Sequence, residues 1–410
     1  RPRSSPHRRD PLAQLSAQGQ GGATLDQLEN RYQDIGWKVD QAAMRALASV
    51  SSNADTGAVG AALRAFYVPW LEESAHRFQT LVKAEGRLSR PKASPASEPQ
   101  PDGVCTVFVD GLRYDVAMQL KDRLGTMGEV SISAAWTSMP SVTASGKAWA
   151  SPVAPWVAGK KDDADFQPSV ASDGKQLSTY NFRRLLGKYG FQVLNKHETG
   201  EPSGRAWVEC GDLDHYGHEH GLRLAKDLDN QLTQIVERLA ELKEAGWVRF
   251  RIVTDHGWLL VPGGLPKTEL SKFQGETRWG RCAVLKDSSQ GTPLTFGWDW
   301  CQDVQIAFAP GIASFIAGAE YAHGGLSLQE CLVPVLELVV AGGSTRSVKV
   351  DIAKVAWTGL RCKVEVLPAT TGLSVDIRTK AALANSTLVA QVKPLENGNV
   401  SLAVDDDANE

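Results

Sequence analysis

One long amphipathic stretch between two short apolar runs limits the folds open to this chain. Residues 222–246 carry leucine or isoleucine on a single helical face and end on a glycine, as expected of a helix with a glycine cap. The runs at 206–210 and 249–254 are apolar and have the length of strands. A strand, a crossover helix and a second strand predict a parallel pair. We therefore expect an α/β fold with a doubly wound, mostly parallel sheet.

Other segments extend this core. Residues 104–110 form a continuous apolar run, which favours a buried parallel strand, and residues 191–195 are a further strand candidate. Residues 116–125 have helical periodicity and end on a glycine. Apolar residues also recur at helical spacing from Leu25 to about Glu85, which predicts two or three N-terminal helices. Their apolar positions must pack on the core or on another protein.

With 410 residues the chain is too long for one ordinary core, so we expect two or three domains. Near the C-terminus the apolar period changes to two, with turn signals at Thr371–Gly372 and Asn397–Gly398, which predicts antiparallel strands. The expected divisions are residues 1–22 as a disordered segment, 23–87 as a helical segment, 88–103 as a linker, 104–342 as the α/β domain and 343–410 as a β-sandwich-like domain.

Charge, cysteine and hydropathy restrict the classes of protein. The net charge of −3 provides no general basic field that would attract nucleic acid. The six cysteines are widely spread and form no C-x-x-C pair, so we expect free thiols in a reducing, cytoplasmic compartment. No apolar run approaches the roughly 20 residues of a membrane span, so we expect no membrane partner. Residue 1 is not methionine and no apolar leader follows, which suggests part of a longer protein that is not exported.

Five short stretches carry the residues with chemistry. They are 107–115 (VFVDGLRYD), 138–146 (SMPSVTASG), 211–221 (GDLDHYGHEHG), 252–257 (IVTDHG) and 321–325 (YAHGG). Each places Asp, His or a hydroxyl beside glycine at or just after an apolar run, and strand ends of open α/β sheets are where ligand sites form. Two divalent ions about 3.5–4 Å apart can drive phosphoryl displacement. The five stretches supply enough O and N donors to hold such a pair.

The order of these motifs resembles that of the alkaline phosphatase superfamily, which includes nucleotide pyrophosphatase/phosphodiesterases and cofactor-independent phosphoglycerate mutases. The wording DGLRYD, MPSVTASGK, TDHGWLLVPGGLPK and HGGLSLQECLVPVLEL is similar to the PglZ family of BREX phage-defence systems, over roughly residues 103–340. The resemblance implies an alkaline phosphatase-like metallohydrolase domain with two divalent metal ions, of which Zn²⁺ and Mn²⁺ suit mixed O and N ligation. It also implies BREX components as partners, among them a BrxB-like companion protein, and nucleic acid as a candidate substrate.

The resemblance further assigns the ligands. One ion would be held by Asp110, Asp255, His256 and the Thr143 oxygen, and the other by Asp214, His218 and His323. Asp214 and His218 are four residues apart, so one helical turn brings them to the same side. Asp255 and His256 are neighbours and can face one site only where the strand breaks, which we expect at Gly257. We expect His215 and His220 to point elsewhere.

Several positions keep alternatives. Asp110 could instead cap the following helix, but Asp115 lies nearer the helical pattern and fits that role better. Thr143 resembles the nucleophile of the diesterase branch, and Ser141 and Ser145 compete with it. The cation that neutralises the phosphate oxygens stays open among three candidates: Lys147, Lys267 and Arg281.

The leading hypothesis is a metal-dependent phosphohydrolase, with phosphodiesterase or nuclease activity through a covalent phosphothreonine. A phosphomonoesterase is the nearest alternative. A non-catalytic scaffold of the defence complex is the alternative from another class, but every ligand position carries a competent residue. A phosphoglycerate mutase-like isomerase is less favoured because no large second insert with an arginine cluster is evident.

Overall fold

The computed structural model describes residues 22–86, 88, 100–271, 275–276, 279–286, 294–341, 350–369, 373–379, 387–389 and 391–404. The chain divides into two compact units, Arg1–Gly343 and Ser344–Glu410. The predicted disordered segment lies outside the described residues except for residue 22, and the predicted linker is described only at 88 and 100–103. Within the described part, none of the helices combines the length and the apolar character needed to cross a membrane.

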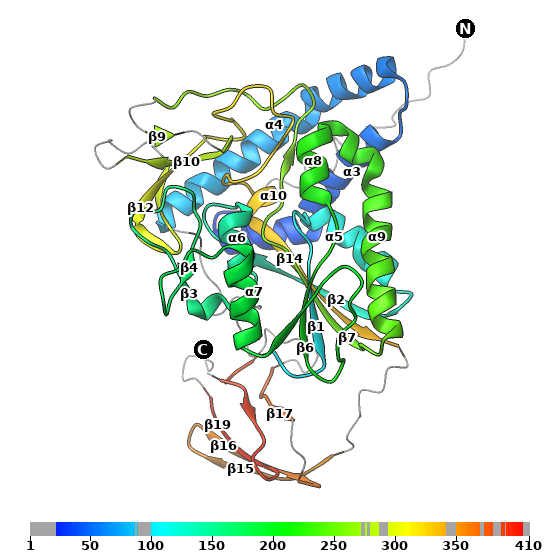
Figure 1. Cartoon of the computed structure of the whole chain (residues 1–410), viewed down its shortest axis with the longest axis vertical. Coiled ribbons are helices and arrows are strands. Elements are labelled where there is room, and N and C mark those ends of the chain that lie inside the picture. Colours follow the sequence, from blue (N-terminus) through cyan, green and yellow to red (C-terminus); the bar gives the residue numbers. More distant parts are fainter. Residues whose placement is uncertain are drawn as a thin grey trace. The chain divides into compact units, whose positions relative to one another are not determined.

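A six-stranded sheet forms the centre of the first unit, in the order β2-β14-β7-β1-β6-β5 (Figure 1). Its strands are β1 (Val104–Phe108), β2 (Gly128–Trp136), β5 (Phe191–Leu194), β6 (Arg205–Glu209), β7 (Arg249–Val253) and β14 (Leu332–Val340). Strands β7, β1, β6 and β5 are parallel, whereas β14 runs antiparallel to both of its neighbours. The predicted mostly parallel α/β sheet is therefore confirmed.

Both faces of the sheet are covered, because successive residues of a strand point to opposite sides. In β1, Val107 belongs to the larger core cluster and Phe108 to the smaller one. Figure 1 shows α5 (Tyr114–Leu124) and α9 (Leu224–Glu244) on one side of the sheet and α7 (Thr179–Lys188) on the other. The stripe predicted for 222–246 is buried in the larger cluster through Leu228, Leu232, Ile235, Leu239 and Leu242.

The N-terminal helices pack on this core. Of the two predicted alternatives, packing on the core or on another protein, the structure shows the first. They are α2 (Leu25–Arg31), a π-helical turn (Tyr32–Gly36), α3 (Trp37–Ala48) and α4 (Asn53–Glu85). Phe78 of α4 is fully buried and stacks on Trp136 of β2, with ring centroids 5.4 Å apart. The amide of Gln79 donates to the carbonyls of Gly311 and Leu326, 2.9 Å from each. Helix α4 is thus bonded to the chain before and after the last motif (321–325).

Shorter elements position the remaining motifs. Helices α6 (Thr143–Trp149), α8 (Leu213–His220) and α10 (Leu328–Cys331) follow strand ends, and 3-10 turns cover Ala154–Trp156 and Gly221–Arg223. A four-stranded antiparallel sheet has the order β11-β12-β10-β9. Its strands are β9 (Gly275–Glu276), β10 (Cys282–Leu285), β11 (Thr295–Trp298) and β12 (Cys301–Phe308). Two short ladders join β8 (Leu259–Leu260) to β13 (Tyr321–Ala322) and β3 (Val157–Ala158) to β4 (Ser169–Val170).

The N-termini of α10 and α5 are capped differently. Ser327 caps α10 and accepts from the Glu330 N–H at 3.3 Å. Asp115 does not cap α5, because that helix begins at Tyr114 and Arg113 is its cap residue. Asp115 lies in the first turn and is fully buried, and it pairs with Arg113 at 2.5 Å. The cap prediction was wrong because a buried arginine holds this carboxylate.

The second unit contains small antiparallel sheets, which confirms the predicted C-terminal β-structure. One sheet has the order β15 (Asp351–Thr358), β16 (Arg361–Leu367) and β19 (Asn399–Ala403), and β17 (Ser374–Val375) pairs with β18 (Lys393–Pro394). At the predicted turn, Asn397 and Gly398 have φ values of 50° and 79°, in the left-handed region that Asn and Gly tolerate. The Thr371–Gly372 turn lies outside the described residues.

Candidate metal centre

The predicted ligands meet at the carboxyl ends of neighbouring parallel strands. Phe108 of β1 and Val253 of β7 are register partners, so Asp110 and Asp255, each two residues further on, leave the sheet side by side. The N–H of Gly111 donates to Asp255 Oδ1 at 3.2 Å, which ties the two turns together. Such strand ends are the usual ligand edge of open α/β sheets.

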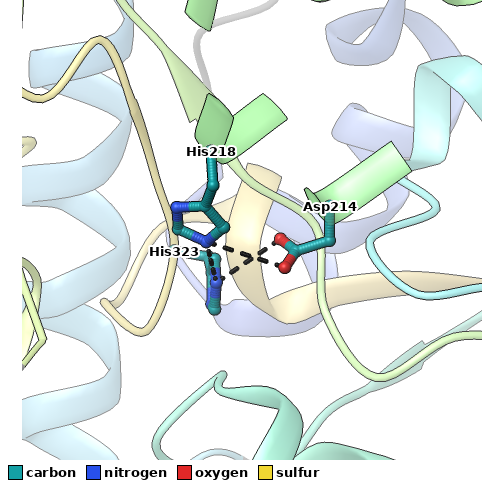
Figure 2. A group of neighbouring side chains, drawn as sticks. All are labelled: Asp214, His218 and His323. Atoms are coloured by element: carbon teal, nitrogen blue, oxygen red, sulfur yellow. Dashed lines mark hydrogen bonds and ion pairs between the residues drawn. The ribbon is translucent and has the colours of Figure 1, made fainter. Parts of the chain in front are cut away.

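One group of donors comprises Asp214, His218 and His323 (Figure 2). Asp214 and His218 lie one turn apart on α8, and His323 directly follows β13. The Nε2 atoms of the two histidines are 2.9 Å apart. Asp214 Oδ1 lies 3.4 Å from His323 Nε2, and Asp214 Oδ2 lies 3.6 Å from His218 Nε2. The predicted helical turn therefore brings both of its residues to one point.

A second group comprises Asp110, Asp214 and His256. His256 Nε2 lies 3.6 Å from Asp110 Oδ1 and 3.5 Å from Asp255 Oδ2, so Asp255 is also at this point. The imidazole rings of His256 and His323 are stacked at 3.7 Å, which places the two groups next to each other. All six predicted metal ligands are thus brought together. The structure adds that Asp214 reaches both groups, whereas the resemblance assigns it to one ion.

The donor set fits divalent cations. An ion with four bonds of about 2.0–2.2 Å has ligand atoms roughly 3.4 Å apart, close to the separations found here. Asp110 Oδ1 and Asp255 Oδ2 are buried and accept no hydrogen bond from the described residues. Buried carboxylate oxygens without partners are costly, and a cation removes that cost.

The electrostatics agree with this fit. Burial raises the pKa of Asp110 well above its usual value, and the nearby carboxylates of Asp255 and Asp214 raise it further. Burial, together with the charge of His256, lowers the pKa of His323 to about 4. His323 is therefore neutral at pH 7 with a lone pair available to bind a cation, and the carboxylates of Asp110, Asp214 and Asp255 lie close to one another.

Backbone carbonyls fix the orientation of two imidazoles. His323 Nδ1 lies 3.1 Å from the carbonyl of Ser141, and His256 Nδ1 lies 3.1 Å from that of Gly257. A carbonyl accepts only from a protonated nitrogen, so Nδ1 carries the proton in each ring. In the neutral form of each ring, Nε2 is then the lone-pair donor and faces the carboxylates.

Thr143 differs from its serine neighbours in what its hydroxyl faces. Thr143 Oγ1 lies 3.1 Å from His256 Nε2 at the start of α6, and its side chain is half-buried. The buried Ser141 hydroxyl donates to the Gly325 carbonyl at 2.9 Å. The buried Ser145 hydroxyl donates to the Phe166 carbonyl at 2.9 Å. Of the three competing hydroxyls, the one on Thr143 adjoins the donor groups.

Glycines allow the motifs to approach one another. A Cβ added at Gly146 would lie 2.7 Å from the carbonyl oxygen of Asp255, so α6 packs directly against that turn. Gly257 does not have a positive φ. A Cβ there would collide with the Gln329 carbonyl oxygen, so this glycine serves close packing.

Arg113 and Trp258 brace the two turns that carry Asp110 and Asp255. The Arg113 guanidinium lies 3.7 Å from the Trp258 ring centroid, and Trp258 Nε1 donates to the Gly111 carbonyl at 2.8 Å. Neither residue was singled out from the sequence. Tyr321 was also missed, although its hydroxyl donates to Asp214 Oδ1 at 2.8 Å. The two-residue period of a strand, which places Tyr321 on the same face as His323, could have found it.

The three candidate phosphate-neutralising cations have different surroundings. Arg281 is fully buried, pairs with Glu330 at 2.9 Å and donates to the Gly311 and Ala313 carbonyls, so it cannot reach a phosphate. Lys267 is half-exposed and pairs with Glu269 at 2.6 Å. Lys147 lies one turn after Thr143 on α6 and acts on the Asp110 carboxyl electrostatically.

Three cavities adjoin the donor groups or α6, and Thr143 lines two of them. One of about 460 Å³ is lined by Thr143, His218 and His323 and by the apolar side chains of Trp279 and Ile316. A second of about 190 Å³ lies along α6 and is lined by Thr143, Lys147, Gln167, Leu177, Thr179 and Phe182. A third of about 220 Å³ is lined by Asp110, Lys147, Glu209, Asp212, Asp214 and His215.

No protein-family model and no curated protein matches the sequence. Similar solved structures include murine ectonucleotide pyrophosphatase/phosphodiesterase 5 in complex with AMP, at 10% identity over 58% of this chain and 88% of the other, with a TM-score of 0.36. Another is phosphonoacetate hydrolase from Sinorhizobium meliloti 1021 in complex with phosphonoacetate, at 14% identity over 63% of this chain and 94% of the other, also with a TM-score of 0.36. Likeness at this level carries no argument about the site, so function rests on the geometry above.

Proposed function

We propose that this protein is a metal-dependent hydrolase of phosphoric esters that acts on phosphodiesters, with Thr143 as the nucleophile. The observation that carries the proposal is the position of Thr143 Oγ1, 3.1 Å from His256 Nε2 and beside two groups of carboxylate and imidazole donors. The competing serine hydroxyls are engaged with backbone carbonyls. A hydroxyl beside a dense donor set is the arrangement that nucleophilic phosphoryl transfer needs.

The metal ligands in this proposal are Asp110, Asp255 and His256 for one ion and Asp214, His218 and His323 for the other. Two divalent ions, when bound there, lower the pKa of a coordinated hydroxyl and stabilise the charge on phosphoryl oxygens. Asp214 belongs to both donor groups and would help to hold both ions. Zn²⁺ and Mn²⁺ suit this mixture of carboxylate and imidazole.

The chain's own residues then account for a two-step reaction. Thr143 Oγ1 loses its proton and attacks phosphorus, so a new P–O bond forms. The bond to the leaving group breaks, and the leaving oxygen takes up one proton in place of the one that Thr143 lost. Water next attacks the phosphothreonine, which releases a phosphate monoester and restores the hydroxyl. The sum is one ester and one water converted to one alcohol and one monoester.

Two features favour a diester as the substrate. Thr143 lines two separate cavities, which suits a phosphorus atom with two organic substituents. The P-S-V-T turn resembles that of the diesterase branch. We propose nucleic acid as the biological diester and membership of the PglZ family, with a role in BREX phage defence beside a BrxB-like companion protein. The motifs DGLRYD and HGGLSLQECLVPVLEL support that part of the proposal.

The test is hydrolysis of bis-p-nitrophenyl phosphate and nicking of plasmid DNA by the purified chain with Mn²⁺ or Zn²⁺. We expect turnover that stops after EDTA treatment and in Asp255→Ala. Rapid turnover of p-nitrophenyl phosphate with none of the diester would assign a phosphomonoesterase instead. If calorimetry detects no divalent ion binding and Asp255→Ala leaves phage restriction intact, the protein is a scaffold.

A further inference from the structure

Lys147 lines two of the three cavities near the candidate metal centre. It lies four residues after Thr143 on α6, so both side chains emerge on the same side of the helix. It lines the 190 Å³ cavity with Thr143 and the 220 Å³ cavity with Asp110 and Asp214. Among the described residues that line the three cavities, it is the only lysine or arginine.

Three side chains hold the ammonium group in place. Lys147 Nζ lies 5.1 Å from the Phe108 ring centroid and 5.7 Å from that of Phe182, within the range of cation–π attraction. It pairs with Glu209 Oε2 at 2.6 Å. Its side chain is 26% exposed, so the group remains accessible from the cavities.

Glu209 is itself fixed and balances the lysine charge. It is the last residue of β6, and its Oε1 accepts from the buried Trp207 Nε1 at 3.1 Å. The pair contributes no net charge where the phosphoryl group would lie. A phosphate monoester has a second pKa of about 6 and so carries nearly two negative charges at pH 7, whereas a diester carries one.

We propose that Lys147 contacts a non-bridging oxygen of the phosphoryl group and that Glu209 tempers this charge, so that the site favours a singly charged diester over a doubly charged monoester. This inference rests on the proposed function, and it assigns the preference for diesters to the ion pair between Lys147 and Glu209. Lys147 supplies a charge-assisted hydrogen bond to the reacting phosphate. Glu209 repels the second negative charge of a monoester, which discriminates by an unfavourable contact.

The experiment compares four variants of the full chain with wild type: Lys147→Met, Lys147→Arg, Glu209→Gln and the control Lys188→Met. Lys188 also lies over an aromatic ring, 5.4 Å from the Tyr189 centroid, but it is exposed on α7 and lines none of the three cavities. Glu209→Gln keeps the acceptor for Trp207 and removes only the charge. Each protein is assayed with Mn²⁺ on bis-p-nitrophenyl phosphate and on p-nitrophenyl phosphate, and calorimetry measures binding of Mn²⁺ and of inorganic phosphate.

We expect Lys147→Met to lower kcat/KM for the diester by about 10²–10³-fold, as loss of one preorganised donor does, with Mn²⁺ affinity unchanged. Lys147→Arg should recover part of the loss. Glu209→Gln should raise the ratio of monoester to diester kcat/KM at least about tenfold and strengthen phosphate binding, because the lysine charge is no longer balanced. Lys188→Met should match wild type.

The inference is overturned if Lys147→Met keeps diester activity and phosphate affinity within threefold of wild type, or if Glu209→Gln leaves the substrate ratio unchanged. Failure of the proposed function has a different signature, because wild-type protein would then hydrolyse neither ester. In that case the binding of inorganic phosphate still tests the contact with Lys147. Equal phosphate affinity in wild type and Lys147→Met would show that Lys147 does not contact the phosphate. If Lys147→Met does not fold, Lys147→Arg and Glu209→Gln carry the test.

Discussion

The guanidinium of Arg113 lies 3.7 Å from the centre of the Trp258 ring, and both side chains are buried. Arg113 follows Asp110 by three residues, and Trp258 follows Asp255 by the same number. The stack therefore joins the two turns that supply carboxylates to the candidate metal centre. The Arg113 Nε and Nη2 atoms also donate to the buried Asp115 carboxylate at 2.5 and 2.9 Å.

Replacement of Arg113 should damage stability and metal binding together. In Arg113→Met the Asp115 carboxylate is left buried without its partner, and we expect a loss of about 3–5 kcal/mol in the free energy of unfolding. Loss of the brace should weaken Mn²⁺ binding by about 10–100-fold. Urea unfolding and calorimetry measure the two effects. The control Arg123→Met breaks a pair with the exposed Asp229 and should cost less than about 1 kcal/mol.

The histidine assignments give a second prediction. His256→Ala should abolish hydrolysis and weaken Mn²⁺ binding, because His256 Nε2 faces Asp110, Asp255 and Thr143. His220→Ala should leave both nearly intact, since that ring packs on Tyr216 at 4.3 Å and its Nε2 faces Glu219. Steady-state kinetics and calorimetry on both variants provide the comparison. Equal losses at the two positions would show that the histidine-rich helix has been misassigned.

The nucleophile can be identified directly. Thr143→Ala should lower kcat by on the order of 10⁴-fold or more while Mn²⁺ binding persists, and Thr143→Ser should keep part of the activity. Rapid acid quench with a ³²P-labelled diester should trap labelled phosphothreonine in the wild type. Ser141→Ala should retain the chemistry and lose about 1 kcal/mol of stability with its hydrogen bond to Gly325. An inactive Ser141→Ala beside an active Thr143→Ala would reverse the assignment.

The strand–helix–strand pattern and the motifs at strand ends were enough to predict the parallel part of the sheet and the edge at which the motifs meet. Local periodicity could not show that β14 inserts between β2 and β7, because that pairing joins Leu336 to Ile132 on one side and to Ile252 on the other. Residues this far apart in the sequence leave no local pattern that would predict which strands pair. The alternation of Val130, Ile132 and Ala134 could have identified β2 itself.

Buried charges were the least predictable part of the site. The sequence made Arg281 a candidate phosphate-neutralising cation and Asp115 a candidate helix cap, and charged residues are mostly exposed. Both are fully buried. Arg281 pairs with Glu330, which is distant in the sequence, and Asp115 pairs with Arg113 at the start of the same helix. An ion pair can offset the cost of burying a charged side chain, but the folded chain decides which charged residues pair. The residue type alone therefore predicts exposure for side chains that are in fact buried.

Asp40 of α3 yields a prediction for pH. Burial raises the pKa of this carboxyl to about 6, partly opposed by the charge of Arg113. The folded protein therefore binds a proton more tightly at Asp40 than the unfolded chain does, with its usual pKa of about 3.9. Stability from this group is present at low pH and is lost as pH rises through about 6. Relative to Asp40→Asn, wild type should lose about 2 kcal/mol of unfolding free energy between pH 4.5 and pH 7.

Urea unfolding of both proteins at the two pH values checks the sign. The difference between wild type and Asp40→Asn cancels the titration of other groups to a first approximation. Tyr32 and Tyr67 each donate to Asp40 at 2.6 Å, so the double variant Tyr32→Phe/Tyr67→Phe should raise the pKa of this carboxyl further. If the wild type instead gains unfolding free energy relative to Asp40→Asn between pH 4.5 and pH 7, Asp40 does not hold a proton in the folded state.

The last prediction concerns the N-terminal helices. Phe78 of α4 is fully buried against Trp136 of the central sheet, and Phe66 on the same helix is 48% exposed. Phe78→Ala should lower the free energy of unfolding by about 3–5 kcal/mol, because a large cavity opens in the core that supports the metal centre. Phe66→Ala should change it by less than about 0.5 kcal/mol.

A detachable docking arm would behave differently. Phe78→Ala would then leave the unfolding of the α/β unit and its Mn²⁺ affinity unchanged, and only binding to a partner would suffer. If Phe78→Ala lowers the free energy of unfolding and Phe66→Ala does not, the helices are an integral part of the metal-binding unit. If a BrxB-like partner binds these helices, it docks on their exposed side, and Phe66→Ala is the matched pull-down variant that keeps the fold intact.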